Sequence, residues 1–336
     1  MAKSQTVKFK NKPVIIGSYS IVGPKEGKGN FGEYFDYVMK NDSFHEDTYE
    51  KAERKMIQHA IVGAIESAKI KPADVDLLLA GDLLNQIISS SYAAREFNFA
   101  YLGLFGACST MAESLAVGAS LVDGKLFNNV VCSTASHFST AERQFRFPLE
   151  LGNQRPPTAQ WTVTGAGACV LSLKGKGPRV TAATFGRVVD YGINDVNDMG
   201  AAMAPSAMDT LLAHFRDTNT TPDDYDLIAT GDLGKLGSEI LIDLMEDQGI
   251  KLGLNYKDCG QMYFTRGQET LSGASGCGCS ATVFNSFIMK KLRDGSYKKV
   301  LFAPTGALLS TTATQQGETI PGVCHAIVIE GMKEEE

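Results

Sequence analysis

The sequence lacks the features that mark several large classes of protein. Nowhere do about 18 apolar residues follow one another without interruption, and the opening stretch MAKSQTVKFKNKP has lysines but no apolar core or cleavage site. We therefore expect no transmembrane segment and no secretory signal. Neither a G-x-x-x-x-G-K-[ST] loop nor a strand-linked G-x-G-x-x-G motif occurs, so nucleotide binding has little support.

Positive charge is also in short supply. The chain has 32 Lys and Arg against 38 Asp and Glu, a formal net charge of -6, and it ends in the acidic run Glu334, Glu335 and Glu336. A protein that binds nucleic acid by its phosphates carries a basic excess. We therefore expect no nucleic-acid partner and interpret the acidic end as a solvated tail.

Cysteine is present without the pattern of a disulfide framework. Seven cysteines, an odd number, are scattered along 336 residues, which favours reduced thiols in a soluble intracellular protein. Cys277 and Cys279 form a C-x-C pair with no second pair nearby, whereas a structural zinc site needs about four ligands. We predict no metal site and no cofactor.

What the chain does contain is an internal repeat. KPADVDLLLAGDL at 71–83 is matched by TPDDYDLIATGDL at 221–233, and Cys108-Ser109 and Asp123-Gly124 recur as Cys279-Ser280 and Asp294-Gly295. The second copy has extra residues between its two landmarks, which places the difference in surface loops. The chain therefore predicts two related halves, 1–175 and 176–336, with Cys108 in the first.

Each copy alternates helices and strands. Apolar residues at helical spacing predict a helix over 48–69, and continuous apolar runs predict buried strands at 75–80 and 130–132. The second copy predicts helices at 205–215 and 280–292 and strands at 227–230, 299–303 and 323–330. This alternation is typical of α/β folds with right-handed crossovers. We predict a layered α/β fold in which the two halves pack as a pseudo-twofold pair.

Several motifs resemble a known superfamily. FGACSTMAESLAVGASLVDGK at 105–125 and WTVTGAGACVLSL at 161–173 resemble the thiolase and β-ketoacyl synthase superfamily, in which a cysteine at a helix N-terminus is the nucleophile. More narrowly, GDLLNQ, GACSTMAESL, the stretch from Cys132 to Leu173, and SGASGCGCSATVFNSFIM resemble the stage V sporulation AD family of spore-forming Firmicutes. The resemblance implies a thiolase-like fold and a role in moving dipicolinic acid, as its calcium chelate, into the spore and out again in germination.

The chemistry of the superfamily requires more than the thiol. A helix N-terminus lowers the pKa of a thiol, so Cys108 is a candidate nucleophile. Condensing enzymes also need two further groups, His-His or His-Asn, but Thr230 stands where one histidine would be, and TLSGASGC at 270–277 has no histidine at all. We interpret the chain as a scaffold without catalytic residues. The alternative is an active acyl-condensing enzyme that uses Cys108.

Candidate ligand-binding residues follow strand ends or lie near the cysteine. Asp82 comes after the strand at 75–80, where α/β sheets place ligands, although its repeat Asp232 makes a structural turn an equal alternative. His137 follows the strand at 130–132, and Arg143 or Arg146 could pair with a carboxylate, with a solvated face as the default. Dipicolinate, a flat ring with two carboxylates, would need such groups. We predict ligand contacts from Asp82, Asn85, Tyr101, Cys108, His137 and Arg143.

The resemblance also implies partners and a location. We expect dipicolinic acid as ligand, with calcium only as part of its chelate, and other membrane proteins of the SpoVA system as partners. These proteins would hold the chain peripherally at the inner membrane of the forespore and spore, because the acidic tail would be repelled by anionic lipid. The uncharged segment FNFAYLGLF at 97–105 predicts a homodimer. A pure scaffold for membrane partners, without ligand binding, is a third possibility.

Overall fold

Two groups of five strands have the same order and the same directions. The computed structural model describes residues 3–145 and 154–332. The first group runs β5 (Ala100–Gly103), β4 (Leu77–Gly81), β6 (Asn129–Ser136), β8 (Gly165–Ser172) and β2 (Val14–Val22). The second runs β11 (Tyr256–Asp258), β10 (Leu227–Thr230), β13 (Lys299–Ala303), β16 (Ala326–Glu330) and β9 (Arg179–Thr184).

The pairing within the groups is also identical. In each group the first two contacts are parallel and the next two are antiparallel. Between β2 and β9 a single pair, Val14 with Arg179, joins the two groups into one sheet. The short strands β1 (Thr6–Lys8) and β3 (Tyr37–Val38) pair with β9 and β2. The predicted duplication is therefore present in the topology, while the boundary at residue 175 stays a prediction.

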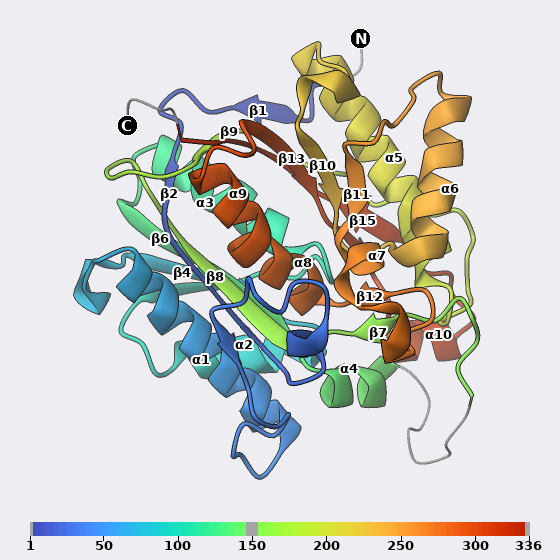
Figure 1. The fold of residues 1–336 in the computed structure, drawn as a ribbon, viewed down its shortest axis with the longest axis horizontal. Coiled ribbons are helices and arrows are strands. Elements are labelled where there is room, and N and C mark those ends of the chain that lie inside the picture. The colour runs from blue at the N-terminus through green and yellow to red at the C-terminus, as the bar shows by residue number, and fades with distance from the viewer. Residues whose placement is uncertain (1–2, 146–153, 333–336) are drawn as a thin grey trace.

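The helices form layers on both sides of these strands. The outer helices are α1 (Tyr49–Ser67) and α2 (Ile88–Ala94) for the first group, and α5 (Met199–Thr218) and α6 (Gly234–Asp247) for the second. Between the groups lie α3 (Thr110–Asp123) and the continuous helical segment α8 (Cys277–Val283), η7 (Phe284–Ile288) and α9 (Met289–Arg293). In Figure 1, α1 is at the lower left and α5 and α6 are at the upper right, with α3, α8 and α9 between them.

The apolar strands supply the core because their side chains alternate between faces. Leu79 points into the central cluster, which also contains Leu115 of α3 and Phe284 of the segment after α8. Leu78, one residue earlier, packs instead in the outer cluster with Met56 of α1. Strands that are buried on both faces need an uninterrupted apolar sequence, which explains the runs seen in both repeats.

Several predicted boundaries move by a few residues. Two short 3-10 turns, η2 (Pro72–Asp74) and η5 (Pro222–Asp224), occupy the proline-started segments, so β4 begins at Leu77. The strand predicted at 323–330 is divided at His325 into β15 (Gly322–Cys324) and β16. Among the described residues, no helix is both long and apolar enough to cross a bilayer.

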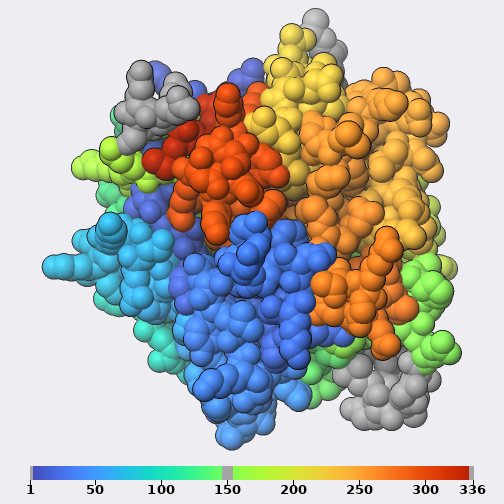
Figure 2. Space-filling model, viewed as in Figure 1, coloured from blue at the N-terminus to red at the C-terminus, as the bar shows by residue number. Residues whose placement is uncertain are grey.

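The remaining elements lie near the junction of the two halves. They include two small sheets, β7 (Trp161–Thr162) with β12 (Ala274–Ser275) and β14 (Thr305–Ala307) with β15. Short helices complete them: α4 (Phe138–Phe145), α7 (Cys259–Tyr263), α10 (Thr311–Gln315), η1 (Glu26–Lys28), η3 (Asn85–Ile87) and η6 (Arg266–Gln268). The early segment, blue in Figure 2, reaches across to the second half, where Asn30 N donates to Tyr263 O at 2.9 Å.

Candidate functional site

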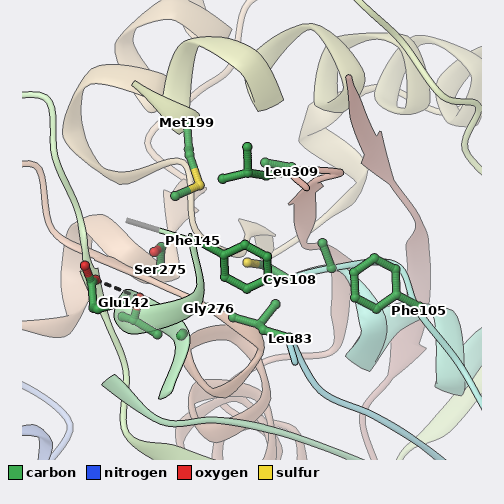
Figure 3. A pocket seen from close by; sticks show the side chains of 13 residues that line it. Leu83, Phe105, Cys108, Glu142, Phe145, Met199, Ser275, Gly276 and Leu309 are labelled. Atoms are coloured by element: carbon green, nitrogen blue, oxygen red, sulfur yellow. Dashed lines mark hydrogen bonds between the residues drawn. The ribbon is translucent and has the colours of Figure 1, made fainter. Parts of the chain in front are cut away.

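A pocket with a free volume of about 40 Å³ opens where the two halves meet. Its walls come from both repeats: the turn after β4, the loop before α3, and α4 from the first half, and α5, β12 and β14 from the second. The lining is mostly apolar, as Figure 3 shows, and consists of Leu83, Phe105, Ala107, Cys108, Ala141, Glu142, Phe145, Thr162, Met199, Ser275, Gly276, Ala307 and Leu309.

The cysteine is presented by a tight turn. Ala107 has φ +48°, a left-handed conformation that non-glycine residues rarely adopt and that often occurs at functional sites. Gly306 packs so closely on this turn that a Cβ there would stand 2.1 Å from Gly106 O and 3.1 Å from Cys108 N. The second-half strand β14 therefore helps to fix the cysteine of the first half.

The environment of the thiol disfavours its ionisation. Burial raises the pKa of Cys108 well above its usual value, and the nearby Asp232 carboxyl raises it further, although the backbone N–H of Gly276 opposes this. Helix α3 begins only at Thr110, two residues beyond the cysteine. The lowered pKa considered from the sequence is therefore wrong in direction, because burial outweighs the helix dipole.

Asp232 is the acidic neighbour of the thiol. Thr305 Oγ1 donates to Asp232 Oδ1 at 2.7 Å, Oδ2 has no hydrogen-bond partner of standard geometry, and the carboxyl interacts with the Cys108 side chain. Burial raises the pKa of this carboxyl to about 7. Near neutral pH the carboxyl and the thiol therefore share one buried site that resists negative charge.

The repeat partner of Asp232 has a different environment. Asp82 is fully buried and accepts from Leu84 N at 2.9 Å and Ser90 N at 2.7 Å, which fixes the start of the segment carrying α2. Burial raises its pKa. The sequence left Asp82 as either a ligand contact or part of a structural turn. Its backbone contacts are those of a structural turn, and Asp82 is not among the residues that line the pocket.

A buried ion pair supports one wall of the pocket. Glu142 of α4 accepts from Thr162 Oγ1 at 3.1 Å and pairs with Arg155 at 2.8 Å. The guanidinium carbon of Arg155 lies 5.2 Å from the ring centre of Trp161, which stacks on Phe138 at 3.9 Å. Because the carboxylate is neutralised by Arg155, α4 can present it to an apolar pocket.

A wider hollow of about 370 Å³ adjoins the pocket and shares four lining residues with it: Leu83, Phe105, Phe145 and Leu309. Asn85 lines this vestibule, and its side chain accepts from Gln144 Nε2 at 2.9 Å. Gln86 and Ile87, also in the wall, have φ +60° and +46°. Two consecutive strained residues at an opening suggest a functional constraint there.

The six predicted ligand residues fall in different places. Cys108 lines the pocket and Asn85 lines the vestibule, whereas Asp82 lies behind them. Tyr101, on the edge strand β5, has its hydroxyl 3.4 Å from Ser91 Oγ. The structure thus brings Cys108, Asn85 and the neighbourhood of Asp82 to one end of the sheet.

His137 and Arg143 already have partners. The His137 ring is buried, with Nε2 2.9 Å from Asp42 O and with Nδ1 accepting from Ser139 N at 3.1 Å, and burial lowers its pKa. Arg143 is exposed on α4 and pairs with Glu50. Arg146 lies outside the described residues. Neither His137 nor Arg143 lines the pocket in this conformation, and their contact with ligand stays a prediction.

Sequence reasoning did not identify the other polar groups of the site. Asp232 was considered only as a copy of Asp82, and Glu142 and Arg155 were not singled out. The polar sequence at 141–146 was a signal that could have identified Glu142, but the prediction drawn from it concerned the neighbouring Arg143 and Arg146. No histidine lines the pocket, among the described residues; Thr230 is buried at the end of β10, where its hydroxyl donates to Asp258 at 2.7 Å.

Comparisons with known proteins agree with this architecture. A family model described as "Stage V sporulation protein AD (SpoVAD)" matches residues 3–330. The stage V sporulation protein AD of Bacillus subtilis (strain 168) is 45% identical over 326 residues, covering 97% of this chain and 96% of that protein.

Solved structures show the same fold at low sequence identity. Xanthomonas campestris OleA bound to cerulenin has a TM-score of 0.63 at 12% identity, covering 98% of this chain and all of that one. Human mitochondrial 3-ketoacyl-CoA thiolase has a TM-score of 0.58 at 10% identity, over 96% of this chain and 99% of its own. The 3-oxoacyl-[acyl-carrier-protein] synthase III of Aquifex aeolicus has 0.55 at 13%, over 95% and 99%. The predicted thiolase-like fold is confirmed.

Proposed function

Because this chain belongs to the stage V sporulation protein AD family, we propose that it acts in sporulation as a binding protein for dipicolinic acid and not as a condensing enzyme. Its place is then the forespore and spore, peripheral to the inner membrane, where it takes part in uptake of the ligand and in its release during germination. Other membrane proteins of the SpoVA system are the partners of this role.

The observation that carries the proposal is the pocket at Cys108. Its aromatic and aliphatic walls, with Phe105 and Phe145 among them, suit a flat ring. Its few polar groups include the hydroxyls of Thr162 and Ser275, the Glu142 carboxylate and the thiol of Cys108. The pocket itself has about 40 Å³ of free volume in this conformation and the adjoining vestibule about 370 Å³, so a bound ring would extend from the pocket into the vestibule.

Electrostatics favours the calcium chelate over the free dianion. None of the described residues that line the pocket is a lysine, arginine or histidine, so a free dianion would find no counter-charge in its wall, and the buried Asp232 beside Cys108 resists further negative charge. Calcium with dipicolinate in equal amounts carries no net charge, since two carboxylates balance the ion. The bound ligand therefore brings its own counter-charge, and the protein needs only to supply shape and a few hydrogen bonds.

Calorimetric titration with dipicolinate, with and without calcium, tests the proposal. Ala141→Phe places a large ring in the pocket wall and should abolish binding, whereas the matched control Val62→Phe, on the exposed face of α1, should bind like the parent. A parent protein that takes up neither form of the ligand would refute the proposal.

The same titration tests the predicted roles of His137 and Arg143. A charge-assisted hydrogen bond lost from either should weaken binding about tenfold or more. Equal affinity of His137→Ala, Arg143→Ala and the parent would show that the ligand does not reach these side chains, whose described contacts are with Asp42 and Glu50.

The competing function is acyl condensation on Cys108, and one contact favours it. Asp232 lies against the thiol and has a pKa near neutrality, so it is placed to accept the thiol proton. Incubation with acyl-CoA or acyl-carrier donors, followed by mass spectrometry of the intact protein, distinguishes the two functions. An acyl adduct that disappears in Cys108→Ser would establish the enzyme.

The scaffold alternative concerns partners and not chemistry. Complex formation with SpoVA membrane proteins by a protein that binds no ligand would favour it.

The proposed homodimer is compatible with all three functions, and its support is the exposed edge of the sheet. Strand β5 is the last strand, and Leu102 on it and Phe105 just after it are 48% and 47% exposed.

A further inference from the structure

Lysines from distant parts of the sequence meet at one end of the sheet. The register places the start of β2 beside the end of β8 and the start of β9, because Val14 pairs with both Ser172 and Arg179. Arg179 in turn pairs with Glu330, and Glu330 with Lys299. The loops that precede or follow these strands therefore share one end, opposite the carboxyl ends of β4 and β10 near which the pocket opens.

This end carries a concentration of positive charge, which we call the basic rim. Segments 8–13 (KFKNKP) and 172–179 (SLKGKGPR) contain lysine and arginine but no acidic residue. The basic rim consists of Lys8, Lys10, Lys12, Lys125, Lys174, Lys176, Lys298 and Lys299, all exposed or partly exposed. Since the whole chain has a formal charge of -6, the remaining surface has an acidic excess and the molecule is electrostatically polarised.

Three acidic residues among these loops accept hydrogen bonds from the backbone. Asp76 accepts from Asn128 N and Asn129 N at 2.7 and 3.0 Å, and Asp226 accepts from Lys298 N and Lys299 N at 2.7 and 2.8 Å. Asp123 accepts from Asn11 N at 2.5 Å. These three carboxylates hold the loops in place, whereas Glu330 pairs with Lys12 of the basic rim at 3.4 Å.

One part of the basic rim combines charge with exposed apolar surface. Lys125 and Lys174 line an open cleft of about 560 Å³ together with Asp74 and Asp76, and Leu126 between Lys125 and Phe127 is 70% exposed. Lysines on flexible stems suit a diffuse anionic surface better than the bidentate recognition for which arginine is used. An exposed leucine beside lysines is the composition that inserts at a lipid headgroup layer.

We propose that the basic rim binds an anionic phospholipid surface directly, with the Cys108 pocket turned away from it. The net charge, considered from the sequence, argues against lipid contact, but a net charge does not show where the charges of the described residues lie. This contact adds to any protein partner and does not depend on the ligand of the pocket.

Flotation of the full chain with vesicles tests the proposal. Vesicles with about 30% phosphatidylglycerol in phosphatidylcholine should carry the protein at about 50 mM salt and release it at about 500 mM, and vesicles of phosphatidylcholine alone should not carry it. Each lysine near an anionic surface contributes roughly fivefold in partitioning, so Lys125→Glu with Lys174→Glu should reduce flotation at least about tenfold.

The matched control makes the same charge change at the opposite end. Lys51→Glu with Lys235→Glu alters the first turns of α1 and α6, near the pocket end of the strands, and should float like the parent. Thermal melting by circular dichroism verifies that both double variants fold. Failure of the parent to float, or equal loss in both double variants, overturns the proposal. Loss of SpoVA partner binding in the first variant, without flotation of the parent, would make the rim a protein-docking face instead.

Discussion

Replacing Asp232 by asparagine should make the protein less sensitive to alkaline pH. The carboxyl is fully buried, with Thr305 donating to one oxygen and Cys108 against the other. Asparagine has nearly the same shape and keeps an oxygen for Thr305, but it cannot ionise. The substitution therefore removes the charge with little change in packing.

The size of the effect follows from the two pKa values of the carboxyl. It is 3.8 for the free group and about 7 in the folded protein. Between these values the folded protein holds a proton that the unfolded chain has released, so the free energy of unfolding falls as the pH rises and levels off above the folded pKa. At about 1.4 kcal/mol per pH unit, the parent should lose about 3 kcal/mol between pH 5 and pH 8 that Asp232→Asn retains.

Urea unfolding followed by circular dichroism at several pH values measures this difference. Glu26 and Glu113, whose pKa values burial also raises to about 7, contribute equally to both proteins and cancel in the comparison. Ligand affinity should follow the same pattern, with dipicolinate binding more weakly to the parent above pH 7 and the variant showing no such loss. Parallel stability curves for the two proteins would show that Asp232 is not protonated in the folded state.

Three further expectations concern single contacts. Cys108→Ser should keep ligand affinity within a few-fold while Cys108→Trp abolishes it in titration, because the residue is pocket wall; a condensation rate lost in Cys108→Ser would reverse this. Leu102→Lys on β5 should convert the predicted homodimer into a monomer, as measured by sedimentation. A parent protein that is already monomeric at micromolar concentration would refute the predicted homodimer. Arg155→Ala should lower the free energy of unfolding in urea by about 3 to 5 kcal/mol, because it removes a cationic partner of the buried Glu142 carboxylate, and Arg155→Ala plus Glu142→Gln should recover part of the loss. An unchanged unfolding midpoint would show that this ion pair does not support the pocket wall.

The repeat in the sequence was sufficient to predict a duplicated α/β fold, because buried parallel strands and their turns leave strong local patterns. The same repeat could not distinguish the roles of Asp82 and Asp232. Both follow a buried strand in a Gly-Asp-Leu turn, yet one caps the α2 segment and the other contacts a thiol more than a hundred positions earlier in the chain. That difference arises from the packing of one half against the other, which no local pattern encodes.

The position of Cys108 at the site was predictable from its motif, but its protonation state was not. The helix N-terminus is visible in the sequence, whereas the burial and the Asp232 carboxyl that raise the pKa of the thiol depend on the packing of the second half, including β14, against the turn that carries Cys108. His137 illustrates the opposite case: the strand before it was predicted, although β6 extends to Ser136 and not only to 132, but the hydrogen bond of its ring to the backbone oxygen of Asp42, from a loop without regular pattern, was not predictable. Side-chain partners across long sequence distances are the part that requires the fold.

Trp161, stacked on Phe138 with the Lys25 ammonium 3.6 Å from its ring centre, is the single tryptophan of the chain. Its neighbour Thr162 lines the pocket. Fluorescence excited at the long-wavelength edge of the protein's ultraviolet absorption therefore originates from one indole, which lies beside the pocket and in contact with the first residue of α4. Trp161 is therefore an intrinsic fluorescent probe, and entry of a small molecule into the pocket can be followed in real time without attaching a dye.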